Sequence, residues 1–110
     1  MLAGVSLMQS CQYEWFDPIE TPEIVSFSEN VIPIFEEGCD GCHKSGGPAP
    51  DLTRENAYSS LMDGGYVNIN APETSIIYTE CAPGGGMSQF TSTGDADIIL
   101  KWIQDGAQNN

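Results

Sequence analysis

The sequence has few basic residues. Lys44, Arg54 and Lys101 are its only lysines and arginines, against 16 Asp and Glu, and the formal net charge is -13. Binding to phosphates requires clustered Lys and Arg, so this composition excludes nucleic acid as an expected partner. The acidic residues are spread along the chain, as is typical of a solvated surface. They would also direct the protein toward a partner with a basic docking patch.

Long hydrophobic runs are missing as well, so we expect no transmembrane span. The opening segment, residues 1–11, is apolar but lacks a basic beginning. We interpret it as the remnant of an export or lipoprotein signal. The residues from Leu7 to Cys11 resemble a lipoprotein cleavage site, which makes Cys11 a candidate lipid anchor. The expected location is therefore outside the cytoplasm, in the periplasm or on a membrane facing the periplasm or the cell surface.

No segment alternates apolar and polar residues long enough to predict a sheet, and there is no internal repeat. We expect an all-α protein. A chain of 110 residues is expected to form one domain with a core that is small for its surface. Its twelve glycines and seven prolines predict much loop. Residues 12–25 have no helical period and are predicted to form an extended tether, and residues 26–110 are predicted to form the folded domain.

Two helices are expected in the first half of this domain. The first is predicted to begin with Ser28 as its N-cap and to end at Gly38. Pro33 lies beyond the first turn and has no N–H group, so the helix either starts later or kinks there. The second is predicted over residues 54–63, after a cap at Thr53. Their expected buried residues are Val31, Ile32, Ile34 and Phe35 in the first helix and Ala57, Tyr58, Leu61 and Met62 in the second.

Two further helices are expected in the second half. A short one, residues 76–78, is predicted after Ser75. The last helix has the clearest pattern and is predicted to have Thr93 or Asp95 as its N-cap and to end at Gly106. Its apolar residues recur at helical spacing: Ile98, Ile99, Trp102 and Ile103.

The residues Cys-Asp-Gly-Cys-His at positions 39–43 form a C-x-x-C-H motif, which is typical of covalent haem attachment. Two thiols three positions apart on one helical turn can reach the two vinyl groups of a porphyrin and form thioether bonds. The next residue then points its imidazole at the iron. The motif therefore predicts a single covalent haem c, held by Cys39, Cys42 and His43.

Other interpretations use the same cysteines. A redox-active C-x-x-C of the thioredoxin type requires a βαβ context, which the sequence lacks. A disulfide between Cys39 and Cys42 leaves His43 without a role. A zinc site in a haem-free module would need a fourth ligand, which Cys81 could supply. Cys81 could also form a disulfide with Cys11, whereas lipidation of Cys11 would leave Cys81 a buried free thiol.

His43 is the only histidine, so a second imidazole is not available to the iron. Of the methionines, Met1 and Met8 lie in the predicted export segment. Met62 lies on the apolar face of a predicted helix, where packing is the usual role. Met87 follows the flexible run Pro-Gly-Gly-Gly, which can bring a thioether to the iron. We therefore predict His43 and Met87 as the axial ligands, with Met62 or an open sixth position as alternatives.

With these features the chain resembles the class I monohaem cytochromes c over residues 26–110. The resemblance rests on the C-x-x-C-H motif, the methionine loop, and the C-terminal pattern Ile-Ile-x-x-Trp-Ile-x-x-Gly-Ala at 98–107. Val-x-Pro-Ile-Phe at 31–35 is similar to the segment before the motif in exported members of the family. Ser88 departs from the family pattern, which often has proline after the ligand methionine.

The resemblance implies a cytochrome c-like fold in which three to five short helices and long loops wrap around one haem. It also implies that the first and last helices cross, with Val31 or Phe35 against Ile99 and Trp102. The implied function is one-electron transfer to redox partner proteins, not enzymatic catalysis, as an exported carrier or a subunit of a respiratory chain. The alternative is a haem domain with an open sixth position that binds a small gas or reduces peroxide.

Overall fold

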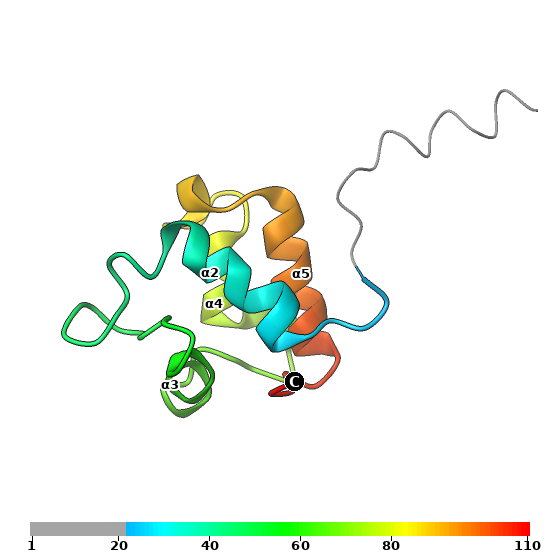
Figure 1. Ribbon diagram of the computed structural model, residues 1–110. Helices are drawn as coiled ribbons and strands as arrows, with labels where there is room; N and C mark the ends of the chain where they lie inside the picture. Colours follow the sequence, from blue (N-terminus) through cyan, green and yellow to red (C-terminus); the bar gives the residue numbers. More distant parts are fainter. Residues whose placement is uncertain (1–21) are drawn as a thin grey trace, which may run out of the picture.

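The computed structural model describes residues 22–110, and this part of the chain is helical (Figure 1). Its α-helices are α2 (Ile32–Gly38), α3 (Ala57–Asp63), α4 (Ile76–Cys81) and α5 (Thr93–Gln104). Three shorter turns accompany them: the π-helical η2 (Phe27–Val31) and the 3-10 turns η3 (Pro72–Thr74) and η4 (Ser88–Phe90). No strand occurs between residues 22 and 110, so the all-α prediction is confirmed for the described residues.

The predicted signal segment, residues 1–11 with Cys11, lies outside the described residues, as does most of the predicted tether. Residues 22–26 have no regular secondary structure. Val25 is nevertheless buried in the core, so the packed part of the chain begins just before the predicted domain boundary. No helix in the described part of the chain is long and apolar enough to cross a membrane.

The first helix begins earlier than predicted, and Pro33 accounts for its irregular start. Ser26, and not Ser28, is the N-cap, and its hydroxyl oxygen accepts a backbone N–H of the first turn at 3.1 Å. Pro33 has no N–H to donate to the carbonyl four residues back. The preceding turn is π-helical, so that the N–H of Ile32 donates to the carbonyl of Phe27, five residues back. Pro33 then lies in the first turn of α2, where its missing N–H is tolerated.

The second helix starts later than predicted. α3 begins at Ala57 with Asn56 as its N-cap, so the prediction of Thr53 as the cap is wrong, and no side chain makes a capping hydrogen bond there. Instead the N–H and the hydroxyl of Thr53 donate to Oδ1 of Asp51, at 3.1 and 2.6 Å. These hydrogen bonds from Thr53 hold the pKa of Asp51 below its usual range. Residues 53–56 therefore form a separate turn before the helix.

The last two helices also have starts that differ in detail from the prediction. Ser75 is the N-cap of α4 as expected, but its hydroxyl accepts the N–H of Asn68 at 2.8 Å and makes no capping bond. α5 is capped by Ser92, so the prediction of Thr93 or Asp95 as its cap is wrong. Ser92 Oγ accepts the N–H of Asp95, and the Asp95 carboxylate accepts the N–H of Ser92, both at 3.0 Å. This reciprocal pair is a capping box, with Asp95 as the third helical residue.

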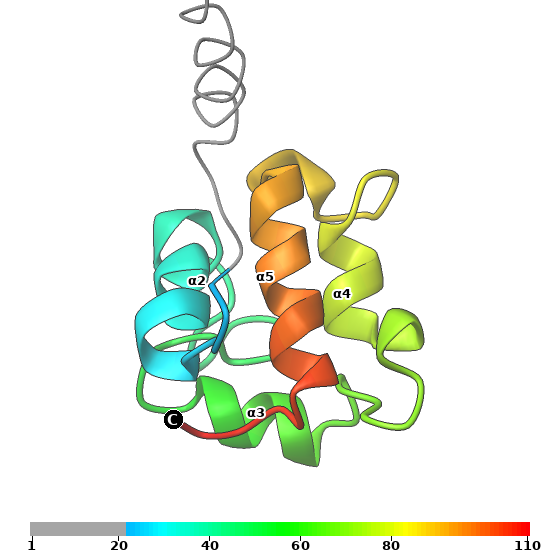
Figure 2. The same ribbon diagram turned by 90° about the vertical axis from the view of Figure 1, so that its right-hand side faces the viewer.

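α5 lies between α2 and α4, and α3 lies beneath them (Figure 2). The predicted packing partners Val31, Phe35, Ile99 and Trp102 all belong to one buried core. The shortest ring contact in this core is made by Phe27, whose ring centroid lies 4.9 Å from that of Trp102. η2 therefore packs on α5 through an aromatic pair, of which the sequence analysis identified only Trp102 as a packing residue.

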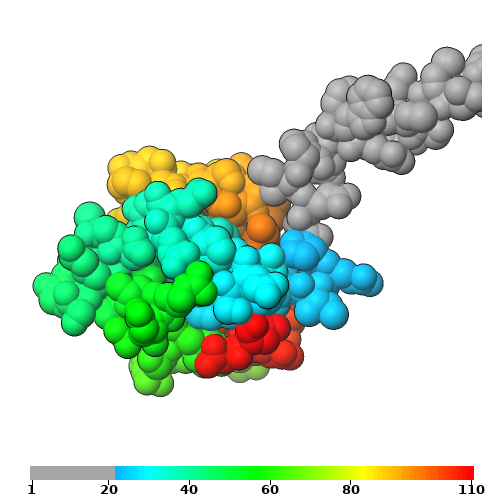
Figure 3. Space-filling view, in the orientation of Figure 1, coloured from blue at the N-terminus to red at the C-terminus, as the bar shows by residue number. Residues whose placement is uncertain are grey.

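The last residues of the chain close the domain over η2. The side chain of Asn110 accepts the N–H of Phe27 at 2.8 Å and donates to the carbonyl of Val25 at 3.2 Å. The hydroxyl of Ser26 donates to the backbone oxygen of Asn110 at 2.8 Å. Figure 3 shows these C-terminal residues, in red, against η2, in cyan. The two ends of the folded domain are thus fastened to each other.

Candidate functional site

A single pocket of about 600 Å³ brings the predicted site residues together. Its lining is almost entirely apolar, and its size lies within the range of small-molecule and cofactor sites. Cys39, Cys42, His43 and Met87 all line it. Met62, the alternative ligand, is not part of the lining and packs against the hydrophobic core. The structure thus gathers two thiols, an imidazole and a thioether around one apolar space.

The C-x-x-C-H motif continues directly from α2. Cys39 is the C-cap of this helix, and its N–H donates to the carbonyl of Phe35 at 2.9 Å. The carbonyl of Cys39 in turn accepts the N–H of Cys42 at 3.2 Å and that of His43 at 2.9 Å. The motif therefore forms one further turn, as its spacing predicted, and all three side chains line the pocket.

A hydrogen bond to the backbone determines which nitrogen of His43 is free. Nδ1 lies 3.2 Å from the carbonyl oxygen of Pro48. Because a carbonyl oxygen can only accept, Nδ1 carries a proton in this bond, and in the neutral imidazole the lone pair is then on Nε2. Bonds of this kind orient a ligating imidazole and raise its basicity. Nε2 is therefore the nitrogen that His43 offers to a metal.

The loop after the motif, residues 44–50, is held back against the motif. The N–H of Leu52, just beyond the loop, donates to the carbonyl of His43 at 2.8 Å. Gly47 has no room for a side chain, because a Cβ there would overlap the carbonyl oxygen of Cys42. Because Gly47 lies so close to Cys42, the carbonyl of the next residue, Pro48, reaches the imidazole of His43. The sequence analysis did not identify the Pro48 carbonyl as a partner of His43, because any residue type can supply a carbonyl.

Met87 reaches the pocket from the loop between α4 and η4. Its backbone N–H donates to the carbonyl of Glu80 at 2.8 Å. Gly85 packs so tightly on the end of α4 that a Cβ would overlap the carbonyl oxygens of Thr79 and Glu80. The last turn of α4 therefore supports the loop. The Met87 side chain remains partly open to solvent, with 38% of the residue exposed.

Exposed apolar side chains gather at this pocket. Of the five large hydrophobic residues that are exposed in the described part of the chain, Ile76, Met87 and Phe90 line it. Apolar side chains exposed together are typical of a surface that binds a ligand or a partner. The sequence analysis did not identify Ile76 or Phe90 as pocket residues. The only signal was their proximity in sequence to a short helix and to Met87.

Cys81 adds a third thiol to the pocket lining. It is free and only 5% exposed. Burial above all, and then the charges of Cys39, Glu80 and Asp95, raises the pKa of Cys81 to about 12. Burial, followed by the charges of Asp40 and Asp95, also raises the pKa of Cys39. Both thiols are therefore protonated at neutral pH, and neither is preformed as a thiolate ligand.

The alternatives to haem attachment gain no support. Between residues 22 and 110, no three His, Cys, Asp or Glu side chains form a group that could hold a metal ion, which disfavours the zinc site of Cys39, Cys42, His43 and Cys81. Cys39 and Cys42 are free thiols in the structure and form no disulfide. Cys81 is free as well, whereas Cys11 lies outside the described residues.

No protein-family model, curated protein or solved structure matches the chain. Its function must therefore be inferred from the pocket itself. The residues present fit a c-type haem: two thiols for the vinyl groups, an imidazole with a free Nε2, and a thioether, all around an apolar space. The predicted axial pair is one histidine and one methionine, and the pocket contains one of each.

Proposed function

We propose that this protein is a c-type cytochrome that transfers single electrons through one haem c. The haem would be attached at Cys39 and Cys42, with His43 and Met87 as axial ligands. The observation that carries the proposal is that these four residues, from segments distant in sequence, line the same apolar pocket. The proposal includes a cytochrome c-like fold, in which the loop after the motif and the methionine loop wrap around the haem.

Each residue of this set has a separate task. When bound, haem c supplies the one-electron chemistry. The two cysteines would hold it by thioether bonds, and Nε2 of His43 would bind the iron on one side. The sulfur of Met87 would bind on the other side, and a thioether ligand raises the reduction potential of a haem. Two occupied axial positions leave no place for O2 or peroxide, which favours electron transfer over catalysis.

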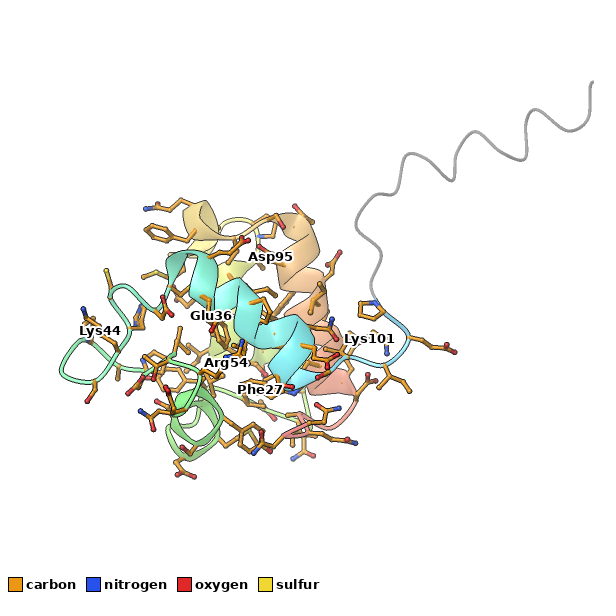
Figure 4. The ribbon with its side chains drawn as sticks, viewed as in Figure 1. Phe27, Glu36, Lys44, Arg54, Asp95 and Lys101 are labelled. Atoms are coloured by element: carbon orange, nitrogen blue, oxygen red, sulfur yellow. The ribbon has the colours of Figure 1, made fainter. Side chains whose placement is uncertain are left out.

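The charge of the surface supports a partner with a basic docking patch. Arg54 forms an ion pair with Glu36 at 3.1 Å, and Lys101 forms one with Asp105 at 2.9 Å (Figure 4). Lys44 is the only cation within residues 22–110 that forms no ion pair, and it lies on the loop after the motif. Carboxylates therefore dominate the field around the domain, and this field would attract a positively charged redox partner.

An exported location completes the proposal. Its support is the apolar segment at residues 1–11, in which Cys11 is the candidate lipid anchor. An exported carrier or a subunit of a respiratory chain would use the haem pocket in the same way.

A second candidate function is a haem with an open sixth position. The partial exposure of Met87 favours it, since a thioether at the edge of a pocket is easier to displace than a buried one. Such a haem would bind a small gas or reduce peroxide. Spectroscopy distinguishes the two functions, because an oxidised haem with a bound thioether has a weak charge-transfer band that a high-spin haem lacks.

The test is to produce the protein in a host that has haem-attachment machinery. We expect a mass equal to the chain plus one haem, with the haem still attached after unfolding. We also expect Met87→Ala to lose the weak charge-transfer band and Met62→Ala, the control, to keep it. Colourless protein of apoprotein mass would overturn the proposal. The opposite behaviour of the two methionine variants would show that the ligand is Met62.

A further inference from the structure

Ser88, the residue after Met87, forms a hydrogen bond that spans the methionine. Its hydroxyl donates to the carbonyl of Gly85 at 2.8 Å, in a partly buried position. Its backbone N–H reaches the same carbonyl at 3.2 Å. These two bonds close a tight turn that has Met87 inside it. The backbone on both sides of the methionine is therefore tied together by one serine.

This turn is fixed to the end of α4. The N–H of Gly85 donates to the carbonyl of Ala82 at 2.8 Å, and the N–H of Met87 donates to the carbonyl of Glu80 at 2.8 Å. Gly85 also lies against the last carbonyls of α4 without room for a side chain. The carbonyl that Ser88 binds is thus a fixed point, and the Ser88 hydroxyl joins the C-terminal side of Met87 to it.

The hydroxyl bond of Ser88 matters because it adds a side-chain restraint to a loop that backbone hydrogen bonds hold at α4. Three consecutive glycines precede Met87, and glycine gains more conformational freedom on release than any other residue. The methionine side chain is itself flexible and is partly exposed. The fraction of time that its sulfur faces the pocket therefore depends on how firmly the backbone around it is held.

We propose that Ser88 is a positioning residue for Met87: its hydroxyl bond to Gly85 keeps the thioether turned toward the pocket and sets how readily an external ligand displaces it. This inference rests on the proposed function, because it requires a haem iron that Met87 binds. It also deepens that function, since the strength of this turn decides between a closed electron carrier and a haem with an accessible sixth position.

The experiment titrates the oxidised holoprotein with imidazole and follows the haem spectrum. Net hydrogen bonds of this kind contribute about 1 kcal/mol, so Ser88→Ala should bind imidazole about fivefold more tightly than the wild type. Ser88→Thr keeps a hydroxyl and should stay close to the wild type. The matched control is Ser59→Ala, because the Ser59 hydroxyl also donates to a carbonyl three residues back, at 3.3 Å, on the exposed side of α3. Ser59→Ala should not change the affinity for imidazole.

A second pair of variants tests the same inference if Ser88→Ala folds poorly. Ser88→Thr and Ser88→Val have nearly the same shape and differ in the hydroxyl, so Ser88→Val should bind imidazole about fivefold more tightly than Ser88→Thr. Equal affinities of these two variants would overturn the inference. So would a loss of unfolding stability in Ser88→Ala without any change in imidazole affinity, because that result indicates a purely structural role.

Met87→Ala separates the failure of this inference from the failure of the proposed function. If Met87→Ala binds imidazole much more tightly than the wild type while Ser88→Ala does not, the positioning role is wrong and Met87 is still the ligand. If Met87→Ala binds like the wild type, Met87 is not an axial ligand and the proposed ligand pair is wrong as well. Tight binding by both variants, with unchanged Ser59→Ala, supports both proposals.

Discussion

Replacing Phe27 by alanine should destabilise the domain more than its place near the start of the described chain suggests. The ring is 3% exposed and contacts three other rings. Its centroid lies 4.9 Å from that of Trp102, 5.4 Å from that of Tyr58 and 6.5 Å from that of Phe35. The substitution removes this side chain and leaves a cavity between η2, α2, α3 and α5.

The expected loss follows from burial and packing together. Replacing a buried phenylalanine by alanine costs about 3–5 kcal/mol, because it combines the lost transfer free energy with a cavity. A domain of this size is stable by about 5–15 kcal/mol, so the loss is a large fraction of the total. Edge-to-face ring pairs such as that with Tyr58 contribute beyond burial alone, which places the value toward the upper part of the range.

The assay is denaturant unfolding of the holoprotein, with the midpoint and the slope measured for each variant. We expect a lower midpoint for Phe27→Ala with the slope unchanged, since the surface exposed on unfolding is nearly the same. Ile24→Ala is the control, because Ile24 is only three residues away but 77% exposed, and it should change stability by less than about 0.5 kcal/mol. Similar losses in the two variants would refute the contact of η2 with α5 as the main support of the N-terminal segment.

Two other residues give independent tests. The pKa of Cys81 is about 12 in the folded protein and about 9 in the unfolded chain, so the folded protein holds this proton more tightly. The protonated thiol therefore contributes fully to the free energy of unfolding below about pH 9, and this contribution is lost as the pH rises toward 12. Unfolding at several pH values in this interval should show a smaller loss for Cys81→Ala than for the wild type, and parallel curves would contradict the burial of that thiol. Ser92→Ala should lose about 1 kcal/mol of unfolding free energy, because it removes the cap of α5. Thr93→Ala should change it little, and equal losses would show that Ser92 is not the cap.

The motif part of the candidate site could be predicted from the sequence because its residues are local. C-x-x-C-H needs only a turn of helix to align its three side chains, and the structure provides that turn after α2. Met87 was identified by elimination and by its glycine-rich run, and it lines the same pocket as the motif. The pairing of Phe90 with this pocket was not predictable, because it depends on how η4 packs and not on any repeat in the sequence.

The starts of the helices were harder to predict than the helices themselves. Ser26 and Ser28 are both good N-cap residues, and their hydroxyls both reach the backbone oxygen of Asn110, at 2.8 and 3.2 Å. The choice between them involves a contact between residues more than eighty positions apart and the widened turn before Pro33. The helix propensity of the residues near Ser26 reflects neither the contact with Asn110 nor the widened turn. The sequence predicts α5 well because its apolar face has a clear period. Its cap is Ser92 instead of Thr93 or Asp95, and it ends at Gln104, two residues before the predicted Gly106.

The hydrogen bonds of Asn110 to the start of η2 limit when the domain can fold during its synthesis. A ribosome makes residues 102–110 well after Phe27, and until then Phe27 has neither the Trp102 ring nor the amide of Asn110 beside it. Contacts between such distant residues also carry the entropy cost of closing a long loop. The nascent chain therefore cannot complete this part of its core before residues 102–110 have been made. Cys39 and Cys42 are made before these contacts can form, so the contacts that close the domain follow the motif in time.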